Sequence, residues 1–122
     1  MPEPKIPGPD HPITIAPNPA RVTVRVGDRV VADSTAALNL HEADYPAVPY
    51  VPLADVDQSL LKPTNTSTHC PYKGDASYYS ITLPDGELTD VVWTYPTPYQ
   101  AVAEIAGHVA FYATKVEITQ AT

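Results

Sequence analysis

The chain has 122 residues, enough for one domain with a single core, and its hydrophobic content of 43% indicates a globular protein. Aspartate and glutamate number 14 against 7 lysines and arginines, which gives a formal net charge of −7. An acidic chain without a basic cluster repels phosphates, which argues against nucleic acids and anionic membrane surfaces as partners.

The cysteine content and the N-terminal sequence bear on the cellular compartment. A single cysteine cannot form an intramolecular disulfide, which is typical of a reducing compartment. Residues 1–5 lack the basic start and the apolar run of a signal peptide. No apolar stretch reaches the roughly 20 residues that cross a bilayer. We therefore expect a soluble, cytoplasmic protein.

Prolines mark the first boundary in the chain. Five of the 15 prolines lie within residues 1–12, which we expect to form a flexible, extended arm. Residues 13–122 are then expected to form one β domain. Its first element is a short strand at residues 13–15, which Pro17 interrupts.

Alternating residues predict the next strands. Strict period two in residues 21–26 places the valines on one face of a half-buried strand. Gly27 and Asp28 suit a two-residue turn, and residues 29–32 run back as the second strand of a hairpin. Residues 35–42 alternate again and predict a further strand.

The middle of the chain is rich in proline. Residues 45–52 carry three prolines spaced by three, a pattern that excludes a helix and a central strand. Tyr50 and Val51 are therefore expected to form only a short edge strand. Residues 55–61 predict one or two helical turns, which Pro63 closes.

The last third of the chain predicts a second hairpin and more strands. Residues 77–83 and 87–95 flank Asp85 and Gly86, which suit the turn between two strands. Residues 108–112 and 115–119 both alternate and predict two closing strands.

One helix is expected before these closing strands, near residues 98–106. Thr97 is a suitable N-cap, Pro98 is allowed at the first helical position and Gln100 completes a capping box. Gly107 suits the helix end. The chain is thus predicted to be mainly β, a single domain of short antiparallel strands and hairpins with one short helix.

Residues 68–74, Thr-His-Cys-Pro-Tyr-Lys-Gly, are the strongest candidate for a site. Chemically active groups on a constrained loop are what a small-molecule site needs. Lys73 and Gly74 offer an ammonium and a backbone N–H to an anion or a carbonyl. The alternative is a solvated lysine, or one paired with Glu42 or Asp55.

Cys70 is a candidate nucleophile, because the nearby cation of Lys73 would stabilise its thiolate. It would need a base from elsewhere in the fold, for which His41 and His108 are possible sources. The alternative is a small buried apolar residue. Cys70 and Lys73 are therefore candidates only for a catalytic role.

Aromatic residues around this loop are the second signal. Tyr72, Tyr79, Trp93 and Tyr95 are predicted walls of a pocket, since rings supply apolar area and polar tips. Each ring taken singly could equally belong to the core. The further candidates for ligand binding are Glu42, Tyr50, Asp55 and Gly74.

Nine short motifs follow one another along the chain in the order seen in one known family. They are Arg21-Val22, Ala32-Asp33-Ser34, Glu42, Tyr50-Val51-Pro52, Asp55-Val56, Thr68-x-Cys70-Pro71-Tyr72-Lys73-Gly74, Tyr78-Tyr79, Val92-Trp93-x-Tyr95-x-x-Pro98 and Ile105-Ala106-Gly107-His108-Val109-Ala110-Phe111-Tyr112. Together they resemble family 427 of the domains of unknown function, from about residue 11 to about residue 119. The resemblance implies a small, mostly β protein that is common in bacteria and also present in fungi, with no established activity.

The family is sometimes labelled nucleotidyltransferase-like, and only Asp55-x-Asp57 could support that label. Two carboxylates on one strand face could hold Mg²⁺ beside phosphates. Both residues are also explained by capping of a short helix. The four histidines lack zinc-like spacing, so we expect no metal and no cofactor.

The favoured function is binding of a small anionic or carbonyl-containing molecule in a pocket beside the Cys70–Gly74 loop, with its chemical transformation left open. The alternative is a non-catalytic β scaffold that presents the Tyr/Pro-rich edge at residues 45–52 to a partner or to its own copy as a homodimer. A metal-dependent nucleotidyltransferase is the third possibility. Enzymatic activity is left open.

Overall fold

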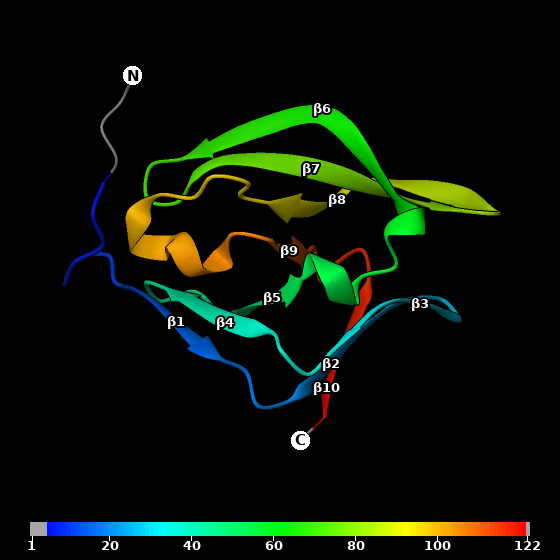
Figure 1. Cartoon of the computed structure of the whole chain (residues 1–122), viewed down its shortest axis with the longest axis horizontal. Helices are drawn as coiled ribbons and strands as arrows, with labels where there is room; N and C mark the ends of the chain where they lie inside the picture. The colour runs from blue at the N-terminus through cyan, green and yellow to red at the C-terminus, as the bar shows by residue number, and fades with distance from the viewer. Residues whose placement is uncertain (1–4, 122) are drawn as a thin grey trace.

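The computed structural model describes residues 5–121, within which ten strands form two antiparallel sheets (Figure 1). One sheet has seven strands in the order β1-β4-β5-β9-β8-β7-β6, and the other has three in the order β10-β2-β3. The predicted mainly β fold of antiparallel strands is confirmed. The strands are β1 (Ile13–Pro17), β2 (Arg21–Val26), β3 (Arg29–Ser34), β4 (Leu38–Glu42), β5 (Val48–Pro52), β6 (Leu61–Cys70), β7 (Gly74–Leu83), β8 (Gly86–Thr94), β9 (His108–Phe111) and β10 (Glu117–Ala121).

The smaller sheet is built on the predicted hairpin of β2 and β3. Val22 and Val24 are fully buried while Arg21 and Arg25 are exposed, as the period-two pattern predicts. Gly27 has a φ of +57°, a conformation that suits glycine in a two-residue turn. The C-terminal strand β10 pairs with the free edge of β2 and completes the sheet.

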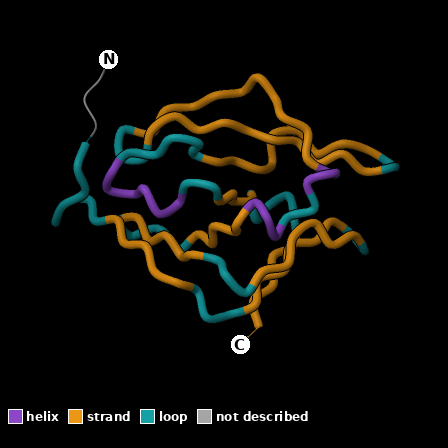
Figure 2. Tube along the Cα trace, viewed as in Figure 1, coloured by secondary structure: helices purple, strands orange, loops and turns teal. Residues whose placement is uncertain are grey.

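Two groups of buried side chains form the core. The first joins the small sheet to the large one through Val22, Val31, Val51, Ile81 and Val92, among others. The second includes Val102 and Ile105 of the short helix η3, whose backbone runs between β4 and β7 (Figure 2). This second group comprises Leu40, Tyr50, Ala76, Tyr78, Tyr95, Val102, Ile105 and Ala110.

The predicted helix near residues 98–106 is present as the 3-10 helix η3 (Gln100–Ile105). The predicted cap at Thr97 is wrong, because Tyr99 precedes the helix and no side chain caps it. Val102 has non-helical dihedrals and kinks the helix. Val102 and Ile105 are both fully buried, so packing against the sheet determines this segment more than capping does.

The helical turns predicted at residues 55–61 are two separate 3-10 turns, η1 (Leu53–Asp55) and η2 (Gln58–Leu60). Pro63 does not close them, contrary to the prediction, but lies inside strand β6. β6 is the outer strand of the large sheet, where the missing N–H of a proline is tolerated. Its pairing with β7 also shifts register between Pro63 and Ser67.

The prediction that Tyr50 and Val51 form only an edge strand is wrong. They belong to β5, which lies inside the large sheet between β4 and β9. Residues 48–50 pair with β4, whereas Val51 and Pro52 pair with β9. Each part of β5 therefore has one paired side, so its prolines do not interrupt two ladders at once.

Residues 1–4 of the predicted N-terminal arm lie outside the described part of the chain. Residues 5–12 lie against the domain, and the backbone N–H of Lys5 donates to the carbonyl of Pro71 at 2.8 Å. The predicted flexibility of the arm stays a prediction. Over residues 5–121, no helix is both long and apolar enough to cross a membrane.

Candidate functional site

The segment predicted as a loop at residues 68–74 is a tight hairpin turn. β6 extends to Cys70 and β7 begins at Gly74, and these two residues pair with each other. Gly74 has a φ of +113°, which side-chain-bearing residues adopt only with strain. The backbone N–H of Tyr99 donates to the carbonyl of Lys73 at 3.0 Å and fixes the turn from outside. The turn that carries Lys73 is thus fixed by the pairing of Cys70 with Gly74 and by the contact with Tyr99.

The Lys73 side chain forms an ion pair with Glu42, one of the two partners considered for it from the sequence. Lys73 Nζ donates to Glu42 Oε1 at 2.5 Å, and their side chains are only 13% and 18% exposed. The second carboxylate oxygen, Oε2, accepts a hydrogen bond from His11 Nε2 at 2.8 Å. Glu42 therefore receives donors from two separate parts of the chain.

Burial and hydrogen bonding shift the pKa values of Glu42 and Lys73 in opposite directions. Burial alone would raise the pKa of Glu42, but the hydrogen bonds from Lys73 and His11 outweigh it and hold that pKa below the ordinary value. Burial is the largest single effect on the pKa of Lys73 and would lower it, but the hydrogen bond to Glu42 and the electrostatic attraction of Tyr50, Glu42 and Cys70 together raise it above the ordinary value. Both groups are therefore ionised at neutral pH.

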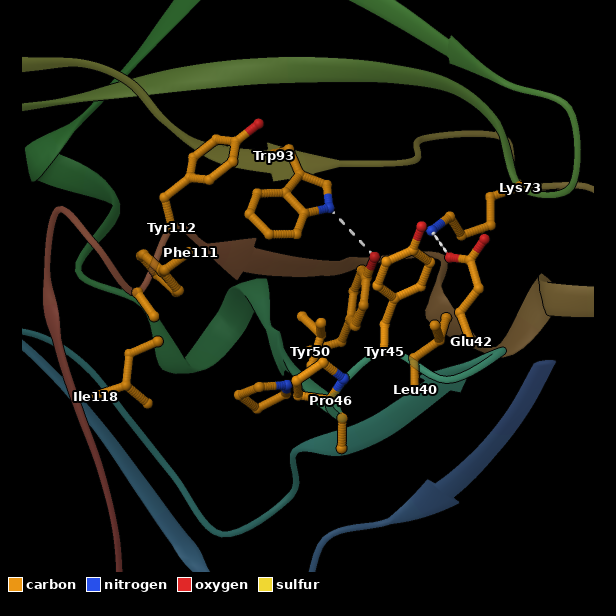
Figure 3. A pocket seen from close by; sticks show the side chains of 14 residues that line it. Leu40, Glu42, Tyr45, Pro46, Tyr50, Lys73, Trp93, Phe111, Tyr112 and Ile118 are labelled. Atoms are coloured by element: carbon orange, nitrogen blue, oxygen red, sulfur yellow. Dashed lines mark hydrogen bonds and ion pairs between the residues drawn. The ribbon is translucent and has the colours of Figure 1, made fainter. Parts of the chain in front are cut away.

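A pocket of about 460 Å³ opens beside this ion pair (Figure 3). The pair lies at one end of the pocket, and Phe111 and Ile118 lie at the other. Among the described residues that line it, Lys73 and Glu42 are the only charged ones. The remaining lining residues are Leu40, Tyr45, Pro46, Ala47, Val48, Pro49, Tyr50, Trp93, Phe111, Tyr112, Ala113 and Ile118.

Aromatic rings form much of the pocket wall. The indole N–H of Trp93 donates to the hydroxyl of Tyr50 at 3.2 Å, and the two rings meet edge to face. The ring of Tyr112 packs at a tilt against Trp93 with centroids 4.7 Å apart. Burial raises the pKa of Tyr50, so its hydroxyl stays protonated. The wall therefore presents apolar ring surface and neutral polar tips.

The pocket brings together four of the predicted site residues from distant parts of the sequence. Glu42, Tyr50, Lys73 and Trp93 all line it. The other candidates, Asp55, Cys70, Tyr72, Gly74, Tyr79 and Tyr95, do not, nor do the possible bases His41 and His108. The roles suggested for these residues stay predictions.

Cys70 and Tyr95 lie behind the pocket, in the second part of the core. Cys70 is half-buried and packs against that group of side chains. Tyr95 is buried, and Lys73 Nζ lies 5.7 Å from the centre of its ring, within the range of a cation–π contact. Burial raises the pKa of Tyr95 strongly. The ring of Tyr95 thus contributes a cation–π contact to the ammonium of Lys73.

Tyr72 and Asp55 lie in different surroundings. Tyr72 stacks on His11, with ring centroids 4.1 Å apart, and so holds the N-terminal segment against the domain. Asp55 accepts a hydrogen bond from Ser34 at 2.6 Å. Asp57, its possible metal-binding partner, caps η2 by accepting from the backbone N–H of Ser59. Both carboxylates thus serve local structure.

Several lining residues carried no clear sequence signal. Tyr45 and Pro46 belong to the segment that was considered as an interaction edge, and they form one wall of the pocket. Tyr112 directly follows β9, and Ile118 lies in β10. His11, which supports Glu42, lies in the predicted arm. Only the aromatic character of Tyr45 and Tyr112 could have suggested a role.

These observations define a small antiparallel β protein with an apolar pocket that is charged at one end. The chain belongs to the family described as Domain of unknown function (DUF427), which it matches over residues 14–122. No curated protein matches the chain.

Proposed function

We propose that the protein binds a small molecule in this pocket. The apolar body of the ligand lies against the rings of Trp93 and Tyr112, and a carbonyl or carboxylate group meets Lys73. The observation that carries the proposal is the placement of one mostly buried ion pair at the end of a pocket whose other described lining residues are uncharged. A few placed polar groups in an apolar hollow are the usual composition of a ligand site.

The size of the pocket supports a ligand of modest dimensions. Ligand pockets commonly measure about 300–1,000 Å³. At about 460 Å³, this pocket has room for a single ring system with a short polar arm. The ring can contact aromatic surface while the arm reaches the Lys73 ammonium.

A binding role is better supported than a catalytic one. The raised pKa of Lys73 keeps its amine protonated, and a protonated amine has no lone pair for nucleophilic attack. Cys70 lies outside the pocket lining. Asp55 and Asp57 also lie outside it, so the proposal assigns no nucleotide transfer to this pocket.

Intrinsic fluorescence can test the proposal, because Trp93 is the single tryptophan of the chain and lines the pocket. A screen of small aromatic acids, amides and ketones is followed by Trp93 fluorescence and by thermal shift. We expect hits that change both signals. In the variant Lys73→Met, their affinity falls about tenfold or more, since a hydrogen bond to a charged group contributes about 1.5–3 kcal/mol.

The matched control is Lys62→Met, which removes a lysine that is also paired with a glutamate, Glu87, but is 66% exposed and outside the pocket. We expect the compounds found in the screen to bind the Lys62→Met variant as tightly as they bind the wild type. The proposal fails if the screen yields no hit, or if both variants weaken every hit equally.

A second function is favoured by one observation, the exposure of ring surface at the mouth of the pocket. Tyr45 is 69% exposed and Tyr112 is 40% exposed. We propose as the alternative that this surface contacts a second copy of the chain. Sedimentation of the wild type and of Tyr45→Ser tests it: a concentration-dependent dimer that the variant loses supports the alternative, and a monomer at all concentrations contradicts it.

A further inference from the structure

We infer that the charged end of the pocket selects an uncharged group that both accepts and donates hydrogen bonds, such as a primary carboxamide, in preference to a carboxylate. The inference rests on the binding function proposed above and narrows its ligand class. It follows from the net charge of the Lys73–Glu42 pair and from the N–H donors and lone pairs that the pair does not use internally.

The net charge at this end of the pocket is the first step. The ammonium of Lys73 already meets the carboxylate of Glu42 at 2.5 Å, so the pair as a unit carries no net charge. An incoming carboxylate that reaches Lys73 also approaches Glu42 and is repelled by it. Because the other lining residues are uncharged and largely apolar, water screens this repulsion less than at the surface.

The hydrogen-bonding capacity of the pair is the second step. An ammonium has three N–H donors, and Lys73 uses one of them on Glu42. A carboxylate oxygen has two lone pairs, so Glu42 Oε1 can accept a second hydrogen bond while it holds Lys73. A donor and an acceptor therefore lie next to each other, and a primary amide presents the complementary acceptor and donor.

The groups around the pair leave this arrangement in place. His11 donates to the other oxygen of Glu42, Oε2, and does not line the pocket. The ring of Tyr95 lies near Lys73 Nζ and adds no charge. Lys5 Nζ lies 5.9 Å from the centre of the Tyr72 ring, and Lys5 does not line the pocket. Within residues 5–121, the pocket lining therefore contains no second cation that could attract an anion.

Matched probes of one shape test the inference: 3-phenylpropanamide, 3-phenylpropanoate and N,N-dimethyl-3-phenylpropanamide. Affinities are measured by calorimetry and by Trp93 fluorescence at about pH 8. We expect the primary amide to bind at least about tenfold more tightly than the carboxylate, which cannot donate and is repelled. The dimethyl amide, which lacks N–H donors, is expected to bind about tenfold more weakly than the primary amide.

The variant Glu42→Gln sharpens the test, because it leaves Lys73 as an uncompensated cation. In this variant we expect the preference to invert, so that the carboxylate binds more tightly than the primary amide. Glu87→Gln, which alters the exposed pair with Lys62, is the matched control and keeps the wild-type preference. If Glu42→Gln does not fold, as judged by circular dichroism, Lys73→Met replaces it and is expected to reject the carboxylate further.

The outcomes separate this inference from the proposed function. If the carboxylate binds the wild type as tightly as the amide, or more tightly, the inference is overturned while binding in the pocket stands. If none of the three probes binds but other hits depend on Lys73, the inference also fails and the proposed function remains. If no compound of either set binds, both fail together.

Discussion

Lys73 and Glu42 meet although three strands of the large sheet, β5, β9 and β8, separate the strands that carry them. Glu42 ends β4, and Lys73 lies in the turn that leads into β7. The sheet must curve strongly for these two ends to touch. The ion pair therefore links the end of β4 to the turn before β7 across the curved sheet.

The strength of this link can be measured by a double-mutant cycle. Glu42→Gln, Lys73→Met and the double variant are compared with the wild type by urea denaturation. We expect a coupling free energy of about 1–2 kcal/mol, because both side chains are mostly buried and neither partner is well solvated alone. The same cycle on the exposed pair Lys62–Glu87 should give less than about 0.5 kcal/mol. Equal coupling in the two pairs would contradict the role given to Lys73 and Glu42.

The pH dependence of stability should carry the signature of Glu42. Its pKa in the folded protein lies below the ordinary value of 4.5, so the unfolded chain binds more protons in that range. The stabilisation by Glu42 is complete above pH 4.5 and is lost as the pH falls through the folded pKa. The difference in unfolding free energy between wild type and Glu42→Gln should therefore shrink in acid, because protonated Glu42 is as neutral as glutamine.

The opposite sign applies to Lys73 in alkali. Its folded pKa lies above the ordinary value of 10.5, so its stabilisation is complete below that pH and is lost as the pH rises through the folded value. Urea denaturation from pH 3 to 11 checks both limits. A wild-type advantage over Glu42→Gln that stays constant down to pH 3 would exclude the assigned pKa direction.

Gly74 is expected to be sensitive to any side chain. Gly74→Ala should destabilise the protein by about 1–3 kcal/mol, because a φ of +113° is strained for alanine. The added methyl group itself would lie 3.5 Å from the carbonyl of Thr97, an ordinary contact, so backbone strain is the main cost. Gly8→Ala is the control, since no atom of the described residues lies within 4 Å of its Cβ position. Thermal denaturation that ranks the two variants equally would refute this reason.

The thiol of Cys70 should react slowly in the folded protein. It is half-buried against the second part of the core, which restricts the approach of a reagent. We expect labelling by a thiol reagent to be at least about tenfold slower in the native state than in urea, since reaction requires local opening. Rapid native labelling that urea does not accelerate would show instead that the sulfur is freely accessible.

Local patterns were sufficient to predict the parts of the fold that depend on neighbouring residues. The β2–β3 hairpin follows from alternating valines and from the turn at Gly27, which are both local signals. Strand β6 was not predicted, because its residues are mostly polar and exposed and do not alternate. Its extended form comes from pairing with β7 rather than from its own sequence.

The candidate site could also be predicted only where it depends on residues close together in the sequence. The sequence offered Glu42 and Asp55 as equal partners for Lys73, and only the tertiary structure distinguishes them, since Lys73 pairs with Glu42 whereas Asp55 accepts from Ser34. The contribution of His11 could not be anticipated, because it arises 31 residues away from Glu42 through the path of the N-terminal segment. Tyr50 and Trp93 were recognised as ring-bearing candidates, but their common wall depends on the neighbouring positions of β5, β9 and β8.

The wall that Pro46 and Pro49 contribute to the pocket has a consequence for the energetics of association. Proline fixes one backbone dihedral, so this segment has few alternative conformations to lose. A ligand that binds against this segment does not have to order a mobile loop. The loss of conformational entropy on ordering a loop usually opposes association. Crystals of the free and occupied protein will therefore share one backbone path through residues 45–49.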